Sequence, residues 1–305
     1  ILTSAFLFVA LIPVVGPVVV IFTPLPVLYY YSQMGRLKGL AVLAASYLAA
    51  FGILSMAGQR VSLAVLFTIG FTGVLLAEIL KRRFSLEKTF LWGSSALFCL
   101  GAGVVLFHSL RAGIAPWQTV ELYVSEIVRH NIAFYSQLNI PEEQIQLIRD
   151  SVPQITRIFT GIFPALAFSG AVLTVWVNLL AGRALFRIKE TPFPDFGDLS
   201  AWKAPERLVW LLIAAGVMTL LPAERVSATG MNLLIVCSLV YLFQGLAIVS
   251  FFFQKKRVPM ILRWLFYGLL LIQQYMLVIV IALGLFDLWV DFRKRIGGTG
   301  NVPAA

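Results

Sequence analysis

The sequence predicts an all-α fold, a polytopic transmembrane helical bundle of about eight or nine membrane helices with an amphipathic extracytoplasmic helical segment. Of the 305 residues, 60% are hydrophobic and only 12% are charged, and the mean hydropathy is +0.90. Soluble domains are on average about half apolar and about a quarter charged. The apolar residues form long blocks without strict alternation, a pattern that favours membrane helices over the strands of a barrel.

The apolar blocks are close to the length of a membrane helix, which needs about 20 residues to cross a hydrocarbon core of about 30 Å. They lie near residues 1–33, 39–57, 61–80, 89–109, 155–182, 207–221, 228–253 and 260–290. Prolines and glycines interrupt the first block, which forms either one broken helix or two. We divide the chain into N-terminal membrane helices (1–109), the extracytoplasmic segment (110–154), C-terminal membrane helices (155–295) with a cytoplasmic loop (183–206), and a flexible tail (296–305).

Basic residues gather at the ends of alternate blocks, and this distribution orients the helices. The four richest clusters are Arg36 with Lys38, residues 81–88, residues 183–207, and residues 255–263. Short loops rich in Lys and Arg stay in the cytoplasm, so we place these clusters there. Membrane orientation then accounts for the formal net charge of +10, and no nucleic-acid partner is expected.

The last block, 260–290, would be about 46 Å long as one helix, at 1.5 Å per residue. Because it contains no proline, we expect a single tilted helix; the alternative is a chain that folds back near Gln273 and Gln274. The single helix leaves the basic residues 293–295 outside the cytoplasm, against the charge rule. Asp291 and Arg295 have the i,i+4 spacing of a helical ion pair.

The extracytoplasmic segment has the periodicity of an amphipathic helix. Its stripe consists of Trp117, Val120, Val124, Ile127, Asn131, Phe134 and Leu138. Pro141 with the two glutamates after it is typical of a second helix start, and Pro153 leads into the next crossing. The two helices either cap the bundle or lie on the membrane surface.

Little in the sequence suits catalysis or metal binding. His108 and His130 stand apart from convergent carboxylates, and no HExxH, GxSxG or P-loop motif occurs. The two cysteines, Cys99 and Cys237, each lie inside an apolar block. We therefore expect no enzyme activity, no catalytic residue, no metal site and no cofactor.

Polar side chains inside the apolar blocks are the candidate site residues, because such groups are costly in a bilayer. The amides are candidate ligands of a small polar solute, or else bond between helices. They are Asn178, Asn232, Gln244, Gln273 and Gln274. Two acids lie near block ends: Glu78 is within one turn of Lys81 and Arg82, where an interfacial ion pair is expected, and Asp287 is near the end of its own block.

Several stretches resemble the YybS-like family of uncharacterised bacterial integral membrane proteins. They are WKAPERLVWLLIAAG from Trp202, YLFQGLAIVSFF after Asn232, LGLFDLWVDFRKR up to Arg295, and FPALAF at 163–168. The resemblance implies a multi-pass protein of the bacterial cytoplasmic (inner) membrane. The stretch PLPVLYYYSQMGRLKG, 24–39, resembles more weakly the substrate-binding components of energy-coupling-factor transporters.

The broken first block, the deep amides and the possible external cap favour a small-solute transporter, or the membrane-embedded substrate-binding component of one. Its partners would be the lipid bilayer, a small polar solute and, because no P-loop occurs, energising transporter subunits if transport is active. The alternative is a non-catalytic membrane scaffold. It would recruit envelope or signalling partners through loop 191–206 or the external helices.

Overall fold

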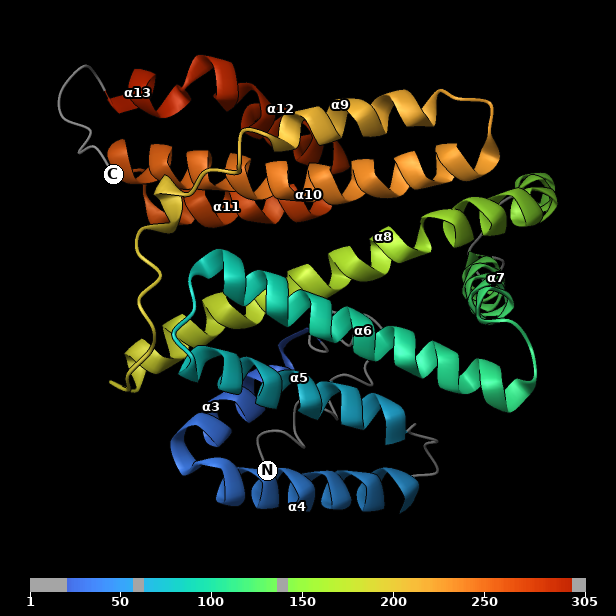
Figure 1. Cartoon of the computed structure of the whole chain (residues 1–305), viewed down its shortest axis with the longest axis horizontal. Helices are drawn as coiled ribbons and strands as arrows, with labels where there is room; N and C mark the ends of the chain where they lie inside the picture. Colours follow the sequence, from blue (N-terminus) through green and yellow to red (C-terminus); the bar gives the residue numbers. More distant parts are fainter. Residues whose placement is uncertain (1–20, 57–62, 136–141, 298–305) are drawn as a thin grey trace. The chain divides into compact units, whose positions relative to one another are not determined.

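A computed structural model describes residues 21–56, 63–135 and 142–297, and no strand occurs among them (Figure 1). Besides the α-helices, the described residues contain one short 3₁₀ helix, η1 (Leu199–Ala201), which lies between α8 and α9 in the chain. The α-helices are α3 (Pro24–Met34), α4 (Arg36–Met56), α5 (Leu63–Lys81), α6 (Leu86–Ala112), α7 (Pro116–Tyr135), α8 (Glu142–Ile188), α9 (Leu208–Thr219), α10 (Glu224–Lys255), α11 (Met260–Ile272), α12 (Gln274–Val290) and α13 (Phe292–Gly297).

Some helices of the described residues have the length and composition of membrane spans. Three stretches are long and apolar enough to cross a bilayer: α6, α10, and Gln146–Ile188 within α8. The pair α11 and α12 gives a fourth if it counts as one broken span. The all-α membrane class predicted from composition is therefore confirmed.

The chain divides into two compact units, the first formed by Ile1–Thr160 with Ala167–Asp195 and the second by Gly161–Leu166 with Phe196–Ala305. In the first unit, α3 packs against both α4 and α5, and α5 packs against α6. A Cβ on Gly73 of α5 would lie 2.7 Å from the Pro24 carbonyl oxygen, so α3 and α5 approach closely there. Of the first apolar block, residues 1–20 lie outside the described residues, and a turn at Thr23 precedes α3.

The segment predicted to be extracytoplasmic is helical, as expected, but its second helix does not end at Pro153. α8 runs without a break for 47 residues, from Glu142 to Ile188, so the second amphipathic helix and the next crossing are continuous. In α7, Val120 and Val124 of the predicted stripe are buried, whereas Trp117 and Ile127 are exposed. Phe134 belongs to the last turn of α7, and Leu138 lies outside the described residues.

In the second unit, α9 and α10 form a helical hairpin, seen side by side in Figure 1. Ser227 Oγ donates to the Thr219 carbonyl across its turn. α12 packs on α10 where two glycines meet: a Cβ on Gly245 would overlap the Val280 carbonyl, and a Cβ on Gly284 would overlap the Tyr241 carbonyl. Small residues let membrane helices approach to backbone contact in this way.

The prediction of one tilted helix over 260–290 is wrong. The block breaks at Gln273, whose backbone is extended, and α11 and α12 are bent by 108°. Each half is tied separately to α10: Arg263 donates to the carbonyls of Phe253 and Val258 at one end, and the glycine contact holds α12 at the other. The single straight helix is therefore not the structure adopted, and the chain bends at Gln273, where the alternative placed its turn.

Gly284→Ala tests the contact between α10 and α12. The added methyl group has no room against the Tyr241 carbonyl, so we expect a loss of roughly 1–3 kcal/mol or more in unfolding free energy, as overpacking costs. The matched control is Gly268→Ala in α11, where a Cβ meets nothing within 4 Å. Thermal unfolding in lipid discs measures both, and equal stability of the two variants would contradict the packing described.

Candidate functional site

The most deeply buried charged pair of the described residues joins Asp287 of α12 to Arg293 of α13. Arg293 Nη1 lies 2.9 Å from Asp287 Oδ2, and the two side chains are 9% and 0% exposed. Gln244 Nε2 of α10 donates to the same oxygen at 3.1 Å, and the Phe292 N–H donates to Oδ1 at 2.9 Å. We call Asp287, Arg293 and Gln244 the Asp287 cluster.

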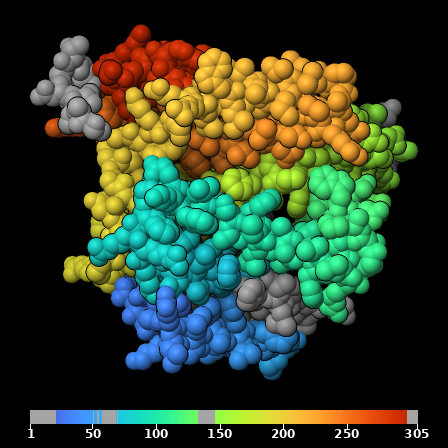
Figure 2. Space-filling model, viewed as in Figure 1, coloured from blue at the N-terminus to red at the C-terminus, as the bar shows by residue number. Residues whose placement is uncertain are grey.

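The Asp287 cluster also holds residues 196–207, which we call the connector. Arg293 Nε donates to the Ser200 carbonyl at 3.1 Å and Nη2 to the Trp202 carbonyl at 2.8 Å. Gln244 Oε1 accepts from the Ala204 N–H at 3.1 Å. In Figure 2 the red C-terminal residues lie against the yellow-to-orange residues of the chain near 200–210. The cluster therefore ties three segments, far apart in sequence, into one end of the second unit.

Asp291 makes the turn that brings Arg293 back to Asp287. Its backbone is left-handed (φ 45°), a conformation that Asp adopts more readily than most residues. Partial burial acts to raise the pKa of its carboxyl, but a hydrogen bond from Lys294 and the charge of Lys203 outweigh this and lower the pKa below its ordinary value. The expected i,i+4 partner is not the one found, because Asp291 pairs with Lys294 and Lys203 rather than Arg295.

Burial has the largest effect on the pKa of the Arg293 guanidinium. It lowers this pKa from its ordinary value, and the charges of Asp287, Asp291 and Asp198 oppose the effect. Arginine starts so far above physiological pH that the group stays charged. The cluster is thus a buried ion pair whose hydrogen-bonding groups are engaged within the protein.

Asn232, a predicted site residue, bonds within its own unit. Its Oδ1 accepts from the Ala165 N–H at 2.8 Å, and its Nδ2 donates to the carbonyls of Gly161 and Ala228, each at 2.7 Å. Gln244 likewise forms hydrogen bonds through both its Nε2 and its Oε1 atoms. These two amides therefore join helices and loop in the second unit, as membrane amides commonly do.

Gln273 and Gln274, the remaining candidates in the second unit, lie at the break between α11 and α12. Both are exposed. The Gln273 N–H donates to the Leu269 carbonyl at 2.7 Å and its own carbonyl accepts from the Met276 N–H. Their position is a helix end rather than the interior of a bundle, so the structure does not gather the predicted amides into one site.

Asn178, on α8, is the predicted site residue with an unsatisfied atom. Its side chain is fully buried. Nδ2 donates to the Ile21 carbonyl at 2.7 Å and to the Thr174 carbonyl at 2.8 Å, which fixes the orientation of the amide. Oδ1 then points away from both carbonyls and has no hydrogen-bond partner among the described residues. A buried orphan of this kind calls for an explanation such as an unseen water, ion or ligand.

Two hydroxyl groups of the first unit are likewise buried and, among the described residues, unsatisfied. Thr89 and Ser94 of α6 are each 1% exposed, and their hydroxyl oxygens also lack partners in the described part of the chain. Gly93 faces α8, because its Cβ would lie 3.3 Å from Val175 Cγ2. Val175 is one turn from Asn178, so these polar groups flank the same contact between α6 and α8. We call Thr89, Ser94 and Asn178 the Asn178 site.

The Asn178 site lies beside the interruption that the sequence placed in the first apolar block. Asn178 bonds to the Ile21 carbonyl just before the turn at Thr23. Pro26 has no N–H, so the Phe22 carbonyl lacks the donor that a regular helix would supply four residues later. The break therefore leaves the Phe22 carbonyl without its helical donor, one residue after the carbonyl that Asn178 binds.

Glu78 forms the interfacial ion pairs expected of it, with one change of partner. It contacts Lys81 at 3.0 Å, as expected, and Arg36 at 2.7 Å in place of Arg82. Tyr31 also donates its hydroxyl to Glu78 at 2.8 Å. These contacts join the ends of α3, α4 and α5.

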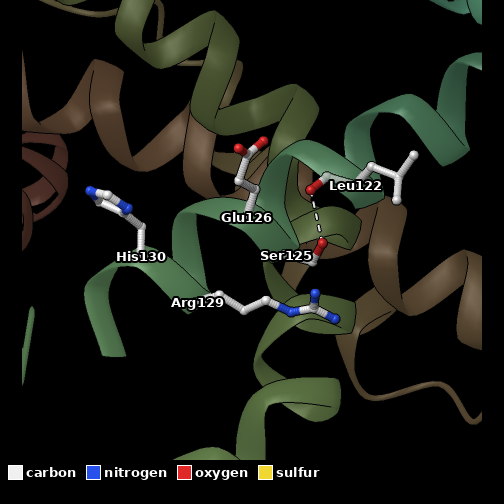
Figure 3. Close-up of a pocket in the computed structure, with 5 residues that line it drawn as sticks. All are labelled: Leu122, Ser125, Glu126, Arg129 and His130. Carbon is white, nitrogen blue, oxygen red and sulfur yellow. Dashed lines mark hydrogen bonds between the residues drawn. The ribbon is translucent and has the colours of Figure 1, made fainter. Parts of the chain in front are cut away.

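A shallow surface depression on α7 does not form a reactive site. It is lined by Leu122, Ser125, Glu126, Arg129 and His130. Figure 3 shows the Glu126, Arg129 and His130 side chains pointing apart, while Ser125 Oγ donates to the Leu122 carbonyl. No group of three His, Cys, Asp or Glu residues placed to hold a metal occurs among the described residues.

Sequence reasoning missed the partners of Asp287 and the two hydroxyls of the Asn178 site. Arg293 is six residues from Asp287, a spacing that a continuous helix does not bring together, and only the turn at Asp291 does so. Thr89 and Ser94 were passed over because helical hydroxyls usually bond to the preceding turn. Their position in an otherwise apolar block was the available signal.

Arg293→Ala tests the Asp287 cluster. Removal of one partner leaves a buried, uncompensated carboxylate, which costs about 3–5 kcal/mol, so we expect a large fall in unfolding free energy and faster proteolysis of the connector. Lys294→Ala is the control, because Lys294 is 73% exposed and an exposed pair contributes about 1 kcal/mol or less. Similar unfolding free energies for the two variants would show that the cluster does not hold the connector.

Comparison with known proteins places the chain in a family. A model of the family described as "Predicted membrane protein (DUF2232)" matches residues 1–288. The chain is 22% identical over 307 residues to the "Uncharacterized protein YybS" of Bacillus subtilis (strain 168), with 95% of this chain and 93% of that protein covered. No solved structure matches. Neither match supports the weaker resemblance to energy-coupling-factor components, whereas the YybS-like resemblance is confirmed. The chain belongs to the DUF2232 family of membrane proteins.

Proposed function

We propose that this protein binds a small polar solute inside the membrane and acts as a transporter, or as the substrate-binding component of one. The observation that carries the proposal is the Asn178 site, in which three buried oxygen atoms have no partner among the described residues. Discontinuous helices with free backbone groups commonly form the substrate sites of membrane transporters.

The chemistry of the Asn178 site suits a neutral solute that donates hydrogen bonds. The Nδ2 group of Asn178 is already engaged, so the amide offers only its acceptor oxygen. The hydroxyls of Thr89 and Ser94 can donate or accept. No acidic residue belongs to the site, which disfavours a divalent cation, since calcium and magnesium are bound largely through carboxylates.

The proposal includes an arrangement in the bacterial cytoplasmic membrane. About eight or nine helices are embedded, residues 110–154 are extracytoplasmic, and the basic helix ends face the cytoplasm. In this arrangement α11 and α12 form a re-entrant pair, because α11 has 13 residues, about 20 Å, too short to cross a core of about 30 Å. The C-terminal basic residues then lie with the connector in the cytoplasm, which removes their conflict with the charge rule.

Cysteine labelling tests this arrangement. In a chain whose two native cysteines are replaced, we expect Glu206→Cys in the connector and Arg295→Cys in α13 to resist a membrane-impermeant reagent added outside spheroplasts. Ala112→Cys should be labelled, because it lies at the C-terminal end of α6, which faces the outside in this arrangement. All three positions are exposed in the structure. Labelling of Arg295→Cys from outside would contradict a shared cytoplasmic location.

Asn178→Ala tests the solute site. The full chain is purified in native-lipid discs and the small molecules that it retains are identified by mass spectrometry. We expect a polar metabolite whose retention falls roughly tenfold or more in the variant, since a buried hydrogen bond contributes about 1–3 kcal/mol. Thr174→Ala is the control, because its hydroxyl bonds to the Gly170 carbonyl one turn away.

Thr89→Val, nearly the same shape, separates loss of binding from loss of folding, and should reduce retention at unchanged folded yield. Identical retained molecules in the wild type, both site variants and a mock preparation would overturn the proposal.

A stoichiometric envelope or signalling protein in the same preparation, without a metabolite, would support the scaffold instead. The scaffold remains the second candidate because the Asp287 cluster orders the connector and α13 into a fixed surface with exposed Lys203 and Lys294.

A further inference from the structure

The turn between α10 and α11 carries three exposed cations next to an exposed apolar helix. Lys255, Lys256 and Arg257 are all exposed, and none forms an ion pair with a carboxylate of the described residues. Other basic residues of the second unit, Lys203, Arg293 and Lys294, do have acidic partners. The charge of this turn is therefore available to a partner from outside the unit.

Backbone hydrogen bonds fix the turn. The Val258 N–H donates to the Phe253 carbonyl at 3.0 Å and the Lys256 N–H to the Phe252 carbonyl at 2.9 Å. Arg257 is held in the left-handed region at φ 50°, a conformation that residues with a Cβ rarely adopt. The three cations thus project from an ordered turn rather than from a freely moving loop.

The fourth cation of this region, Arg263, completes the turn from α11. Its Nε donates to the Val258 carbonyl at 2.9 Å and its Nη2 to the Phe253 carbonyl at 3.0 Å. The Phe253 ring packs edge-on to Phe266 and Tyr267 of α11. One side of α11 is therefore packed on the end of α10, which sets the direction of its other side.

The other side of α11 is an apolar stripe that is largely exposed in the described part of the chain. Ile261, Trp264, Leu265 and Ile272 are 57–80% exposed, and their spacing of three, one and seven places them along one face of the helix. In a membrane protein such a face contacts lipid chains, and an exposed tryptophan close to a helix start is typical of the interface with the headgroups. The cations and the stripe are contiguous, because α11 begins three residues after Arg257.

We propose that the α10–α11 turn binds an anionic phospholipid, with its phosphate at Lys255, Lys256 and Arg257 and its acyl chain along the Ile261–Ile272 face of α11. The charge is complementary, since basic residues beside a membrane helix attract acidic headgroups. The apolar stripe distinguishes this site from a cationic surface that would hold free phosphate equally well. The interaction is independent of the solute site in the first unit.

The test is native mass spectrometry of the full chain released from discs of phosphatidylglycerol and phosphatidylcholine. We expect the wild type to retain phosphatidylglycerol, and the variant Lys255→Gln/Lys256→Gln/Arg257→Gln to retain roughly tenfold less. The matched control, Arg82→Gln/Arg83→Gln/Lys88→Gln, removes the same charge from exposed residues of another helix end and should change retention little. Equal losses in the two triple variants would reduce the effect to general charge and overturn the proposal.

Trp264→Ala adds a readout that does not change charge. It should also lower phosphatidylglycerol retention, and brominated phosphatidylglycerol should quench less tryptophan fluorescence in this variant than in the wild type. Unchanged retention and unchanged quenching would show that the acyl chain does not follow α11. Displacement of the lipid by millimolar inorganic phosphate would identify a simple phosphate site and contradict the assignment.

Discussion

A polar group inside a membrane protein must find its partner within the protein, because lipid chains offer no hydrogen bond. This constraint explains more of the structure than any single helix contact. In the second unit it is met fully at the Asp287 cluster, where one carboxylate accepts from Arg293, Gln244 and the Phe292 N–H. The arginine and the glutamine in turn bond to the backbone of the connector. The connector is thereby ordered by the buried charges of Asp287 and Arg293, either of which would be costly without its partner.

The buried amides of the two units meet the same constraint differently, and the difference locates the candidate site. Asn232 and Gln244 in the second unit have partners for both their oxygen and their nitrogen atoms. Asn178 in the first unit uses its nitrogen and leaves its oxygen without a partner among the described residues. Three amide side chains, all predicted as candidate ligands, thus divide into two structural ones and one suited to binding.

The elements that depend on local sequence were predictable, and those that depend on distant contacts were not. Hydropathy located the membrane helices, and the three-four spacing located α7, because both signals come from neighbouring residues. The break at Gln273 was only the alternative to the expected single helix, since it follows from Gly245 meeting α12 and from Arg263 reaching the end of α10. The pairing of Arg293 with Asp287 depends on one left-handed residue, Asp291, whose conformation a spacing rule does not reveal. The ion pair of Glu78 with Lys81 was predictable because the two residues are only one turn apart.

The central claim is that the amides of Asn232 and Gln244 are fully bonded in the second unit, whereas the amide of Asn178 in the first unit keeps an open oxygen in the described part of the chain. A structure of the full chain in a lipid disc, at a resolution that shows ordered water and ligands, tests it most directly. The account predicts non-protein density within hydrogen-bonding distance of Asn178 Oδ1, and only protein partners around Asn232 and Gln244. A protein donor bonded to Asn178 Oδ1, or a bound solute at Gln244 in place of the Ala204 N–H, would contradict it.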